Sequence, residues 1–431
     1  MKIAIIGAGY SGMSIAKELA KDNEIVMFEK EKEVGGMVST FEVANTRLEK
    51  YYRHIFKSDK EVIELVEDLK LSDKLIWPAT KMGYLVNKKM YAWGTPISLL
   101  QFKELNFIEK MRFGFNVVHL KLINDYKKLE KCTAEEWFTK RIGNNIYSKI
   151  WEPLLISKFG DKKKDISMAW MWGKIKLRST SSSMEGENLG YIEGSYQALT
   201  DALYKYLLDK KVKIELETPI EKIEKEKDKY KIVAKGNTYE GFDIVVSTVN
   251  YEQSYKLLKK YVTKEEKEKM QAVEYTAART MVMVTDKSFG PYYWLNIGDN
   301  DIPFGGIIEH TNFIKEEKYE NKHIIYISNY MSKENKLYSY SKEELFNEYM
   351  KHLTKINKDF KKKNVKEYYV FDEEYAQPII ECNYSENIME HKLEKENIYL
   401  CTMPQIYPED RGMNYAIKLG KTISEEIKEN S

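Results

Sequence analysis

Short apolar runs alternate with helically spaced apolar positions at the start of the chain. Residues 3–6 form one apolar run after Lys2, residues 25–28 form a second, and Ala16 and Leu19 continue a periodic pattern between them. Continuous apolar runs of this length are typical of strands buried on both faces, whereas the spacing between them is that of a helix. The pattern therefore predicts a strand, a helix and a second, parallel strand.

Later apolar runs predict that the same sheet continues far along the chain. Residues 242–248 have the pattern of a fully buried parallel strand, and residues 397–401 predict another, followed by a helix from Gly412 toward Ile427. Strands so far apart predict an α/β fold, in which a Rossmann-like domain is interrupted by a discontinuous α+β substrate-binding domain. We expect the first domain to comprise residues 1–80, 190–250 and 376–431, and the second to comprise residues 81–189 and 251–375.

One segment within the second domain, residues 105–123, is unusually rich in apolar residues. The alternating residues 81–93 before it predict a β-hairpin, and the capping box at Thr133 after it predicts the start of a helix. The dense segment has two interpretations: a helix that docks on a membrane or lines a substrate channel, or a helix of the core. We favour the core helix, because an interfacial helix should separate its charges more cleanly.

Composition and charge narrow the class of protein. The chain has 431 residues, 43% of them apolar, and a formal net charge of +2, so nucleic acid is not an expected partner. No apolar stretch approaches the roughly twenty residues that cross a bilayer, and a strand rather than a signal peptide opens the chain. We therefore expect a cytoplasmic protein with at most a peripheral membrane contact. Three scattered cysteines predict neither disulfides nor a metal site.

The turn after the first strand carries the chemistry of dinucleotide binding. Gly7 permits the tight turn, Gly9 lets the backbone approach a pyrophosphate, and Gly12 lets helix and strand pack closely. Glu29 closes the second strand, where a carboxylate accepts hydrogen bonds from a ribose hydroxyl. An acid at this position argues against a 2′-phosphate, so the sequence predicts an ADP-like ligand.

A glycine doublet, Gly35-Gly36, follows the second strand, and Gly412-Met413-Asn414 opens the last helix. With these motifs the chain resembles the FAD-dependent flavoproteins that include amine oxidases, protoporphyrinogen oxidases and phytoene desaturases. The family usually has an arginine where Met37 stands, so only the backbone role of the doublet carries over. The resemblance implies FAD as the cofactor, held by Gly7, Gly9, Tyr10, Ser11, Gly12, Glu29, Lys30, Gly35, Gly36, Met37, Ile220, Gly412, Met413 and Asn414.

Three residues are candidates for the chemistry beside the flavin. His54, in the string His54-Ile55-Phe56, resembles a segment of UDP-galactopyranose mutase, and its unperturbed pKa suits a proton donor. His310 lies among polar groups at a predicted strand end, and Tyr407 lies in the stretch that should project near the ring. The candidate substrate contacts are Arg53, Trp294, Asn312 and Arg411.

Three functions follow from this pattern. The first is an FAD-dependent oxidoreductase that passes a hydride from a sizeable, partly apolar small-molecule substrate to flavin N5, with oxygen, a quinone or a protein as electron acceptor. The second is a redox-neutral isomerase or mutase acting on a nucleotide-linked sugar, similar to UDP-galactopyranose mutase. The third is a flavoprotein that only binds, without catalysis. We favour the oxidoreductase.

Overall fold

Five parallel strands form a sheet whose members come from widely separated parts of the chain. The computed structural model describes residues 1–179 and 187–430. The strands lie in the order β11-β2-β1-β15-β21, and every neighbouring pair is parallel. Their bounds are Lys2–Ile6 (β1), Glu24–Phe28 (β2), Lys213–Glu215 (β11), Ile244–Ser247 (β15) and Ile398–Leu400 (β21). The predicted Rossmann-like α/β fold is confirmed.

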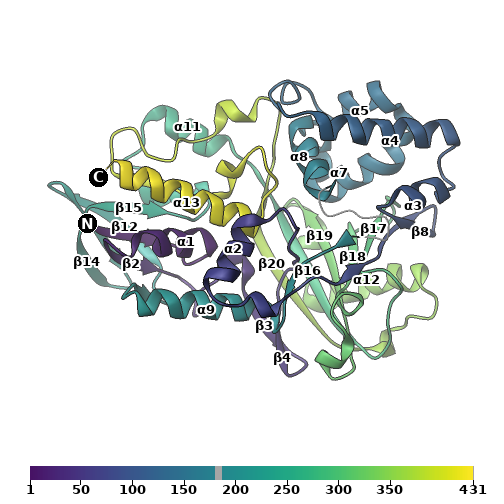
Figure 1. Ribbon diagram of the computed structural model, residues 1–431, viewed down its shortest axis with the longest axis horizontal. Coiled ribbons are helices and arrows are strands. Elements are labelled where there is room, and N and C mark those ends of the chain that lie inside the picture. Colours follow the sequence, from purple (N-terminus) through teal and green to yellow (C-terminus); the bar gives the residue numbers. More distant parts are fainter. Residues whose placement is uncertain (180–186, 431) are drawn as a thin grey trace.

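Alternate residues of the central strand face opposite layers of this domain. Ile3 and Ile5 are buried in the cluster that includes α1, α9 and α13, whereas Ala4 and Ile6 are buried with the three-stranded meander β12-β13-β14. The helices span Tyr10–Leu19 (α1), Lys60–Asp68 (α2), Ser195–Asp209 (α9) and Met413–Glu429 (α13). The meander spans Ile220–Glu226 (β12), Lys229–Ala234 (β13) and Asn237–Phe242 (β14). Figure 1 shows this domain on the left.

A seven-stranded mixed sheet, in the order β20-β16-β19-β18-β17-β7-β8, organises the second half of the molecule. Its bounds are Met82–Val86 (β7), Lys89–Trp93 (β8), Tyr275–Thr285 (β16), Trp294–Ile297 (β17), Gly306–Glu309 (β18), His323–Met331 (β19) and Val365–Pro378 (β20). The predicted hairpin is confirmed, since β7 and β8 pair antiparallel around Asn87-Lys88. Helix α12 (Lys342–Ile356) packs against this sheet through Leu345 and Tyr349.

Helices α3 to α8 gather beside the mixed sheet, at the upper right of Figure 1. They span Pro96–Gln101 (α3), Phe107–Leu122 (α4), Ala134–Ile142 (α5), Asn144–Ile146 (α6), Glu152–Phe159 (α7) and Met168–Ser179 (α8). Helix α5 begins after the predicted capping box, in which the Thr133 hydroxyl accepts a hydrogen bond from the Glu136 amide at 3.2 Å.

The remaining elements are short or lie beside the first sheet. Helices α10 (Tyr251–Leu258) and α11 (Lys264–Ala272) follow β15. Two-stranded pairs join β3 (Thr40–Val43) to β4 (Thr46–Glu49), β5 (Leu75–Ile76) to β10 (Tyr191–Ile192), and β6 (Ala79–Thr80) to β9 (Glu187–Asn188). The strands of the two large sheets come from the two sets of segments expected for the two domains; the domain boundaries themselves stay a prediction.

The prediction that residues 105–123 form a core helix is wrong for most of α4. Only Phe113 and Leu120 of this helix are buried, whereas Phe107, Phe115 and other apolar residues are exposed. The helix lies at the edge of the helical cluster and packs against α5 and α8 along one side. Apolar density predicted a helix, but it could not show how many neighbours cover that helix. No helix among residues 1–179 and 187–430 is long and apolar enough to cross a membrane.

Candidate FAD and substrate site

The loop after β1 and the glycine doublet after β2 come into backbone contact. Gly7 has φ of +101°, Gly35 of +118° and Gly36 of +56°, conformations that favour glycine. A side-chain carbon at Gly36 would lie 3.1 Å from the Gly9 Cα, and Gly9 pairs with Gly35 in a β-bridge. The two loops therefore form a cradle of bare backbone at the start of α1, where helix amides and dipole favour a pyrophosphate.

Gly12 has the tightest surroundings of these glycines. A side-chain carbon at Gly12 would lie 2.2 Å from the Gly7 carbonyl oxygen and 3.2 Å from a methyl group of Ile5. Helix α1 can therefore approach β1 this closely only with glycine at position 12. The close approach holds the first amides of α1 against the turn at Gly7, which is the arrangement that the fingerprint predicts.

Glu29 lies buried at the end of β2, beside the cradle. Its carboxylate accepts hydrogen bonds from the Ala8 amide at 2.8 Å and from the Glu31 amide at 3.0 Å. Each carboxylate oxygen retains a further lone pair, so the group can also accept from a hydroxyl. The residues present here fit the ADP half of FAD.

Other residues predicted to bind the cofactor lie around this cradle, but not all present their side chains to it. The Tyr10 hydroxyl hydrogen-bonds the Thr200 hydroxyl at 2.9 Å, so Tyr10 faces α9. Ser11 lies on α1 next to it and contacts α13, while Ile220 begins β12. Lys30 is exposed, with its ammonium 3.6 Å from the Glu31 carboxylate. Their roles toward FAD stay predictions.

The N-terminus of α13 is the candidate for the second half of the cofactor site. Gly412, Met413 and Asn414 line a large cavity, and the Asn414 carboxamide oxygen accepts from the Val62 amide of α2 at 3.2 Å. The first amides of α13 have no partner within the helix, and its dipole favours negative charge there. These groups fit the flavin edge that becomes negative on reduction.

An arginine lies beside Met37 although Met37 itself replaces the arginine usual in the family. The Arg53 guanidinium donates to the Met37 carbonyl oxygen, and both residues line the cavity. The Nε atom of Arg53 and the Nε1 atom of Trp294 are buried and have no hydrogen-bond partner within the protein. Buried donors left unpaired are costly, so their presence beside the α13 terminus fits a bound group with acceptor atoms.

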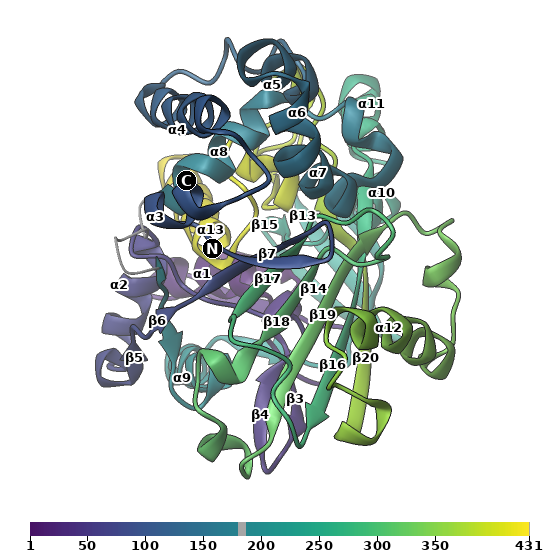
Figure 2. The ribbon, with the colours of Figure 1, turned by 90° about the vertical axis from the view of Figure 1, so that its right-hand side faces the viewer.

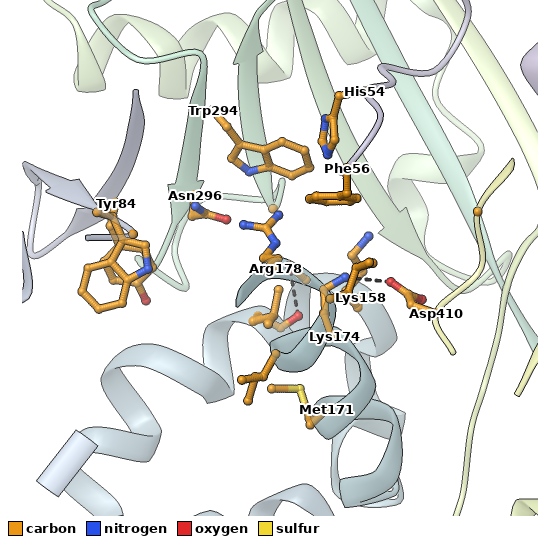
Figure 3. A pocket seen from close by; sticks show the side chains of 18 of the residues that line it. His54, Phe56, Tyr84, Lys158, Met171, Lys174, Arg178, Trp294, Asn296 and Asp410 are labelled. Atoms are coloured by element: carbon orange, nitrogen blue, oxygen red, sulfur yellow. Dashed lines mark hydrogen bonds and ion pairs between the residues drawn. The ribbon is translucent and has the colours of Figure 1, made fainter. Parts of the chain in front are cut away.

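The cavity has a volume of about 770 Å³ and extends from Met37 and Gly412 to helices α3 and α4. Its far part is apolar, with Leu99, Val117 and Ile175 among the lining side chains. Its central part is polar. Figure 3 shows Lys158, Lys174 and Arg178 reaching into it from the helices, opposite His54, Phe56 and Trp294. The site therefore combines an apolar wall with a cluster of cations.

Five ionisable residues gather at the centre of the cavity: Lys158, Lys174, Tyr330, Asp410 and Arg411. The Lys174 ammonium lies 2.9 Å from the Asp410 carboxylate, and the Trp170 indole N–H donates to the same carboxylate at 3.3 Å. Lys158 places its ammonium 3.6 Å from the centre of the Tyr330 ring. Arg411 donates to the Tyr330 hydroxyl and, through Nε at 2.7 Å, to Gln377.

Burial and the charges within this group shift the pKa values of Asp410, Lys158 and Tyr330. Burial opposes ionisation of Asp410, but Lys174, Arg411 and Lys158 outweigh it and lower its pKa to about 2. Burial is also the main reason that the pKa of Lys158 falls to about 8. Burial raises the pKa of Tyr330, yet Arg411 and Lys158 outweigh that effect and bring it to about 7. The cluster therefore changes its charge near neutral pH.

His54 lies in the wall of the cavity, as a candidate beside the flavin should. Its Nδ1 lies 3.1 Å from the Tyr293 hydroxyl, and burial, together with Arg178 and Lys174, lowers its pKa to about 3. The imidazole is therefore neutral near pH 7 and can exchange hydrogen bonds, whereas the unperturbed pKa considered from sequence would have allowed it to donate a proton. A role for His54 stays a prediction.

The candidate substrate residues divide into two groups. Arg53, Trp294 and Arg411 all line the cavity. The Trp294 ring lies 5.3 Å from the Arg178 guanidinium carbon and 4.6 Å from the Tyr52 ring. Asn312 instead donates to the carbonyl oxygens of residues 290 and 292, at 2.7 and 3.0 Å, and is not among the lining residues.

Two of the candidates for chemistry also lie outside the lining of the cavity. His310 is buried, its Nε2 lies 2.7 Å from the Tyr319 hydroxyl, and burial lowers its pKa to about 3. Tyr407 packs its ring against Tyr126 and Tyr384, at 5.4 and 5.2 Å between centres. Their placement gives both residues structural contacts, and a role at the flavin stays a prediction.

Lys158, Lys174 and Arg178 were not recognised from the sequence as site residues. A signal was present, because Met171, Lys174, Ile175 and Arg178 recur at spacings of three and four, which is one face of a helix. That face lines the cavity. The sequence could not show which neighbour it meets, since the opposing residues come from strands and loops more than 100 positions away.

Comparison with known proteins identifies the family. A family model described as flavin containing amine oxidoreductase matches residues 10–377. A provisionally assigned protoporphyrinogen oxidase from Exiguobacterium sp. 255-15 superposes with a TM-score of 0.79 at 17% identity, covering 100% of this chain and 99% of that one. Cyclohexylamine oxidase from Brevibacterium oxydans IH-35A gives 0.75 at 14% identity, covering 99% of each chain. No curated protein matches the sequence significantly.

Identities this low show a shared fold, whereas the family model covers more than half of the chain and shows the family. The resemblance to FAD-dependent amine oxidases and protoporphyrinogen oxidases that the motifs predict is thereby confirmed, and with it an oxidoreductase that uses FAD. The chain belongs to the family of flavin-containing amine oxidoreductases.

Proposed function

We propose that this FAD-dependent oxidoreductase oxidises a sizeable, partly apolar organic substrate that carries an anionic group. The observation that supports the proposal is the joining of a cationic cluster and an apolar wall in one cavity of about 770 Å³. The cluster would hold the anion and the wall would hold the apolar part. FAD, when bound, supplies the hydride acceptor at N5.

The charges of the cavity favour an anion over an ammonium ion. Five basic side chains line its central part: Arg53, Lys158, Lys174, Arg178 and Arg411. Three carboxylates also line the cavity, Asp59, Glu373 and Asp410, and the last is paired with Lys174. A protonated amine would meet net repulsion here, so the proposed substrate differs in charge from the amine that the name of cyclohexylamine oxidase indicates.

Each group would have a defined task. Arg411 and Lys158 would bind the anion, and the protonated Tyr330 hydroxyl between them would donate a hydrogen bond to it. Trp294, flanked by Arg178 and Tyr52, would exclude water from the reacting carbon. The His54 imidazole would orient the substrate by hydrogen bonding. Its low pKa keeps the ring neutral near pH 7, so it would not act as a proton donor to the substrate.

The mutase interpretation receives less support. A nucleotide-linked sugar would also suit a cationic cluster, but it would leave the apolar wall at Leu99, Val117 and Ile175 without a partner. Redox chemistry separates the two functions. An oxidoreductase should bleach its oxidised flavin when it is mixed anaerobically with substrate, whereas a mutase should turn over only after its flavin has been reduced chemically.

Ligand charge provides the direct test of the proposal. We expect decanoate and decyl phosphate to perturb the visible spectrum of the bound oxidised flavin, and decylamine of the same chain length to bind at least about tenfold more weakly. Titration of the holoenzyme, followed at the flavin bands, measures all three dissociation constants. Tighter binding of decylamine than of decanoate would contradict the anionic substrate, and colourless protein that cannot be reconstituted would contradict FAD binding.

Anion binding should weaken as the pH rises from about 6 to about 9. Tyr330 loses its proton near pH 7 and then neutralises its cationic neighbours, and Lys158 loses its charge near pH 8. Decanoate stays ionised throughout. We therefore expect its dissociation constant to rise at least about tenfold over this range. In Tyr330→Phe the rise should be smaller and should follow Lys158 alone; a flat profile in the unmodified protein would contradict the assigned ionisations.

A further inference from the structure

One face of α3 and α4 gathers most of the exposed large apolar side chains of the protein. Phe107, Ile108, Phe115 and Leu122 are 70, 77, 69 and 74% exposed. The complete α3–α4 face consists of Ile97, Leu100, Phe107, Ile108, Met111, Phe115, Val118 and Leu122. Elsewhere in residues 1–179 and 187–430, only Met1 and Leu208 are large apolar residues exposed to this degree. Such a concentration on one face indicates an interaction site.

The apolar residues of α4 form a single stripe. Residues 107, 111, 115, 118 and 122 follow one another at spacings of four, four, three and four, which keeps them on one side of a helix. The two buried residues, Phe113 and Leu120, lie on the opposite side. At 1.5 Å per residue the helix is about 24 Å long. The helix therefore has two apolar sides, one packed on the protein and one turned outward.

Basic side chains flank this stripe. At 3.6 residues per turn, Lys110 and Lys121 fall along one border of the stripe and Arg112 along the other, while Lys103 lies between α3 and α4. The two carboxylates of residues 96–123 are engaged within the protein: Glu104 accepts from the Tyr91 hydroxyl at 2.6 Å, and Glu109 caps its own helix. An apolar stripe bordered by cations is typical of a helix that lies on an anionic bilayer.

The α3–α4 face is continuous with the substrate cavity. Leu100, Met111, Phe115 and Val118 belong to the exposed face and also line the cavity, as do the bordering Lys110 and Lys121. Figure 2 shows α3 and α4 together at one edge of the molecule. The cavity therefore reaches the surface through this face, and an apolar molecule leaving a bilayer could enter it without crossing water.

We propose that the α3–α4 face docks on an anionic lipid bilayer and opens the cavity to it, so that the substrate is an anionic amphiphile taken from the membrane. The docking stands on the exposed stripe and its bordering cations. The substrate source rests on the proposed function, because it assigns the entering molecule to the cavity beside the flavin. A second copy of the chain is the competing occupant, but its identical bordering cations would face one another across such an interface.

Vesicle binding by the FAD-loaded protein tests the docking. We expect it to sediment with vesicles made of equal parts phosphatidylcholine and phosphatidylglycerol, and to bind vesicles of phosphatidylcholine alone at least about tenfold more weakly. Phe107→Ser combined with Phe115→Ser should reduce binding to the mixed vesicles at least about tenfold. Lys103→Gln combined with Lys121→Gln should reduce it by a similar factor.

Matched controls separate docking from general surface effects. Leu208→Ser removes an exposed apolar residue of α9, and Lys256→Gln combined with Lys264→Gln removes two exposed charges from α10 and α11. Both controls should bind the mixed vesicles within about twofold of the unmodified protein. Flavin content and the melting temperature of every variant show that it has folded.

Three results would overturn the docking: no sedimentation with either vesicle, unchanged binding of the double phenylalanine variant, or a dimer in solution that this variant converts to a monomer. Decanoate titration of the same preparations keeps the proposals apart. Vesicle binding without decanoate binding would leave docking intact and contradict the proposed function. Decanoate binding without vesicle binding would leave the proposed function intact and contradict the docking.

Discussion

Gly12→Ala is expected to yield protein without bound FAD. The added methyl group would lie 2.2 Å from the Gly7 carbonyl oxygen, so α1 must move away from β1 and the cradle at Gly9 must open. Overpacking of this kind costs about 3 kcal/mol of folding free energy, and backbone contacts to the pyrophosphate would be lost with it. The ratio of flavin to protein absorbance after purification, together with the melting temperature, measures both effects.

Gly290→Ala is the matched control for this prediction. An added methyl group at Gly290 meets no atom within 4 Å, and the backbone there does not need a positive φ. We expect this variant to keep its FAD and to melt within about 2 °C of the unmodified protein. Full flavin content and an unchanged melting temperature in Gly12→Ala would show that the close approach of α1 to β1 is not needed for the cofactor.

Arg411→Gln should weaken decanoate binding about 100-fold while leaving FAD in place. The guanidinium is the member of the cluster that bonds to both Tyr330 and Gln377, and a charge-assisted hydrogen bond to a carboxylate contributes about 1.5–3 kcal/mol. Loss of this charge should also raise the pKa of the Tyr330 phenol, because Arg411 is the largest influence that lowers it. Flavin-band titration measures the first effect, and ultraviolet absorbance of the phenolate measures the second.

Arg141→Gln serves as the control for loss of an arginine. Arg141 is exposed on α5, where its guanidinium carbon lies 5.3 Å from the centre of the Trp137 ring, and it does not line the cavity. Decanoate should bind this variant as it binds the unmodified protein. Unchanged decanoate binding in Arg411→Gln would show that the anion is held elsewhere and would contradict the role proposed for the cluster.

The nucleotide-binding half of the fold could be predicted because its strands, turns and helix can be recognised from residues close together in the sequence. The strand, turn and helix of residues 2–19, and the glycines within them, depend on neighbours a few positions away. The hairpin of β7 and β8 and the cap at Thr133 are local in the same sense. For α4 the pattern gave a helix but not its surroundings. Its stripe is exposed because α5 and α8 pack against the other side of the helix, which periodicity within the segment cannot show.

The substrate half of the site was predicted only in part, because it is assembled from distant elements. The predicted substrate residues Arg53, Trp294 and Arg411 do line the cavity, yet Asn312 lies outside its lining. Lys158 sits on a helix whose sequence shows no chemistry of its own. Its pKa is low mainly because it is buried, with Lys174 and Arg411 lowering the pKa further, and this burial arises only where α7, α8 and β19 meet. The sequence of one element alone cannot show that the three elements meet at this point.

The order in which the parallel sheet is assembled has a consequence during synthesis. Strand β21 and helix α13 lie next to β15 and α1 in space but follow the whole mixed sheet in sequence. The close crossing of α13 over α1 at Gly420 therefore forms only when the last part of the chain has left the ribosome. A nascent chain carries a finished nucleotide fingerprint long before it has the helix terminus predicted to hold the flavin ring, so we expect maturation of the holoprotein to wait until β21 and α13 have been made.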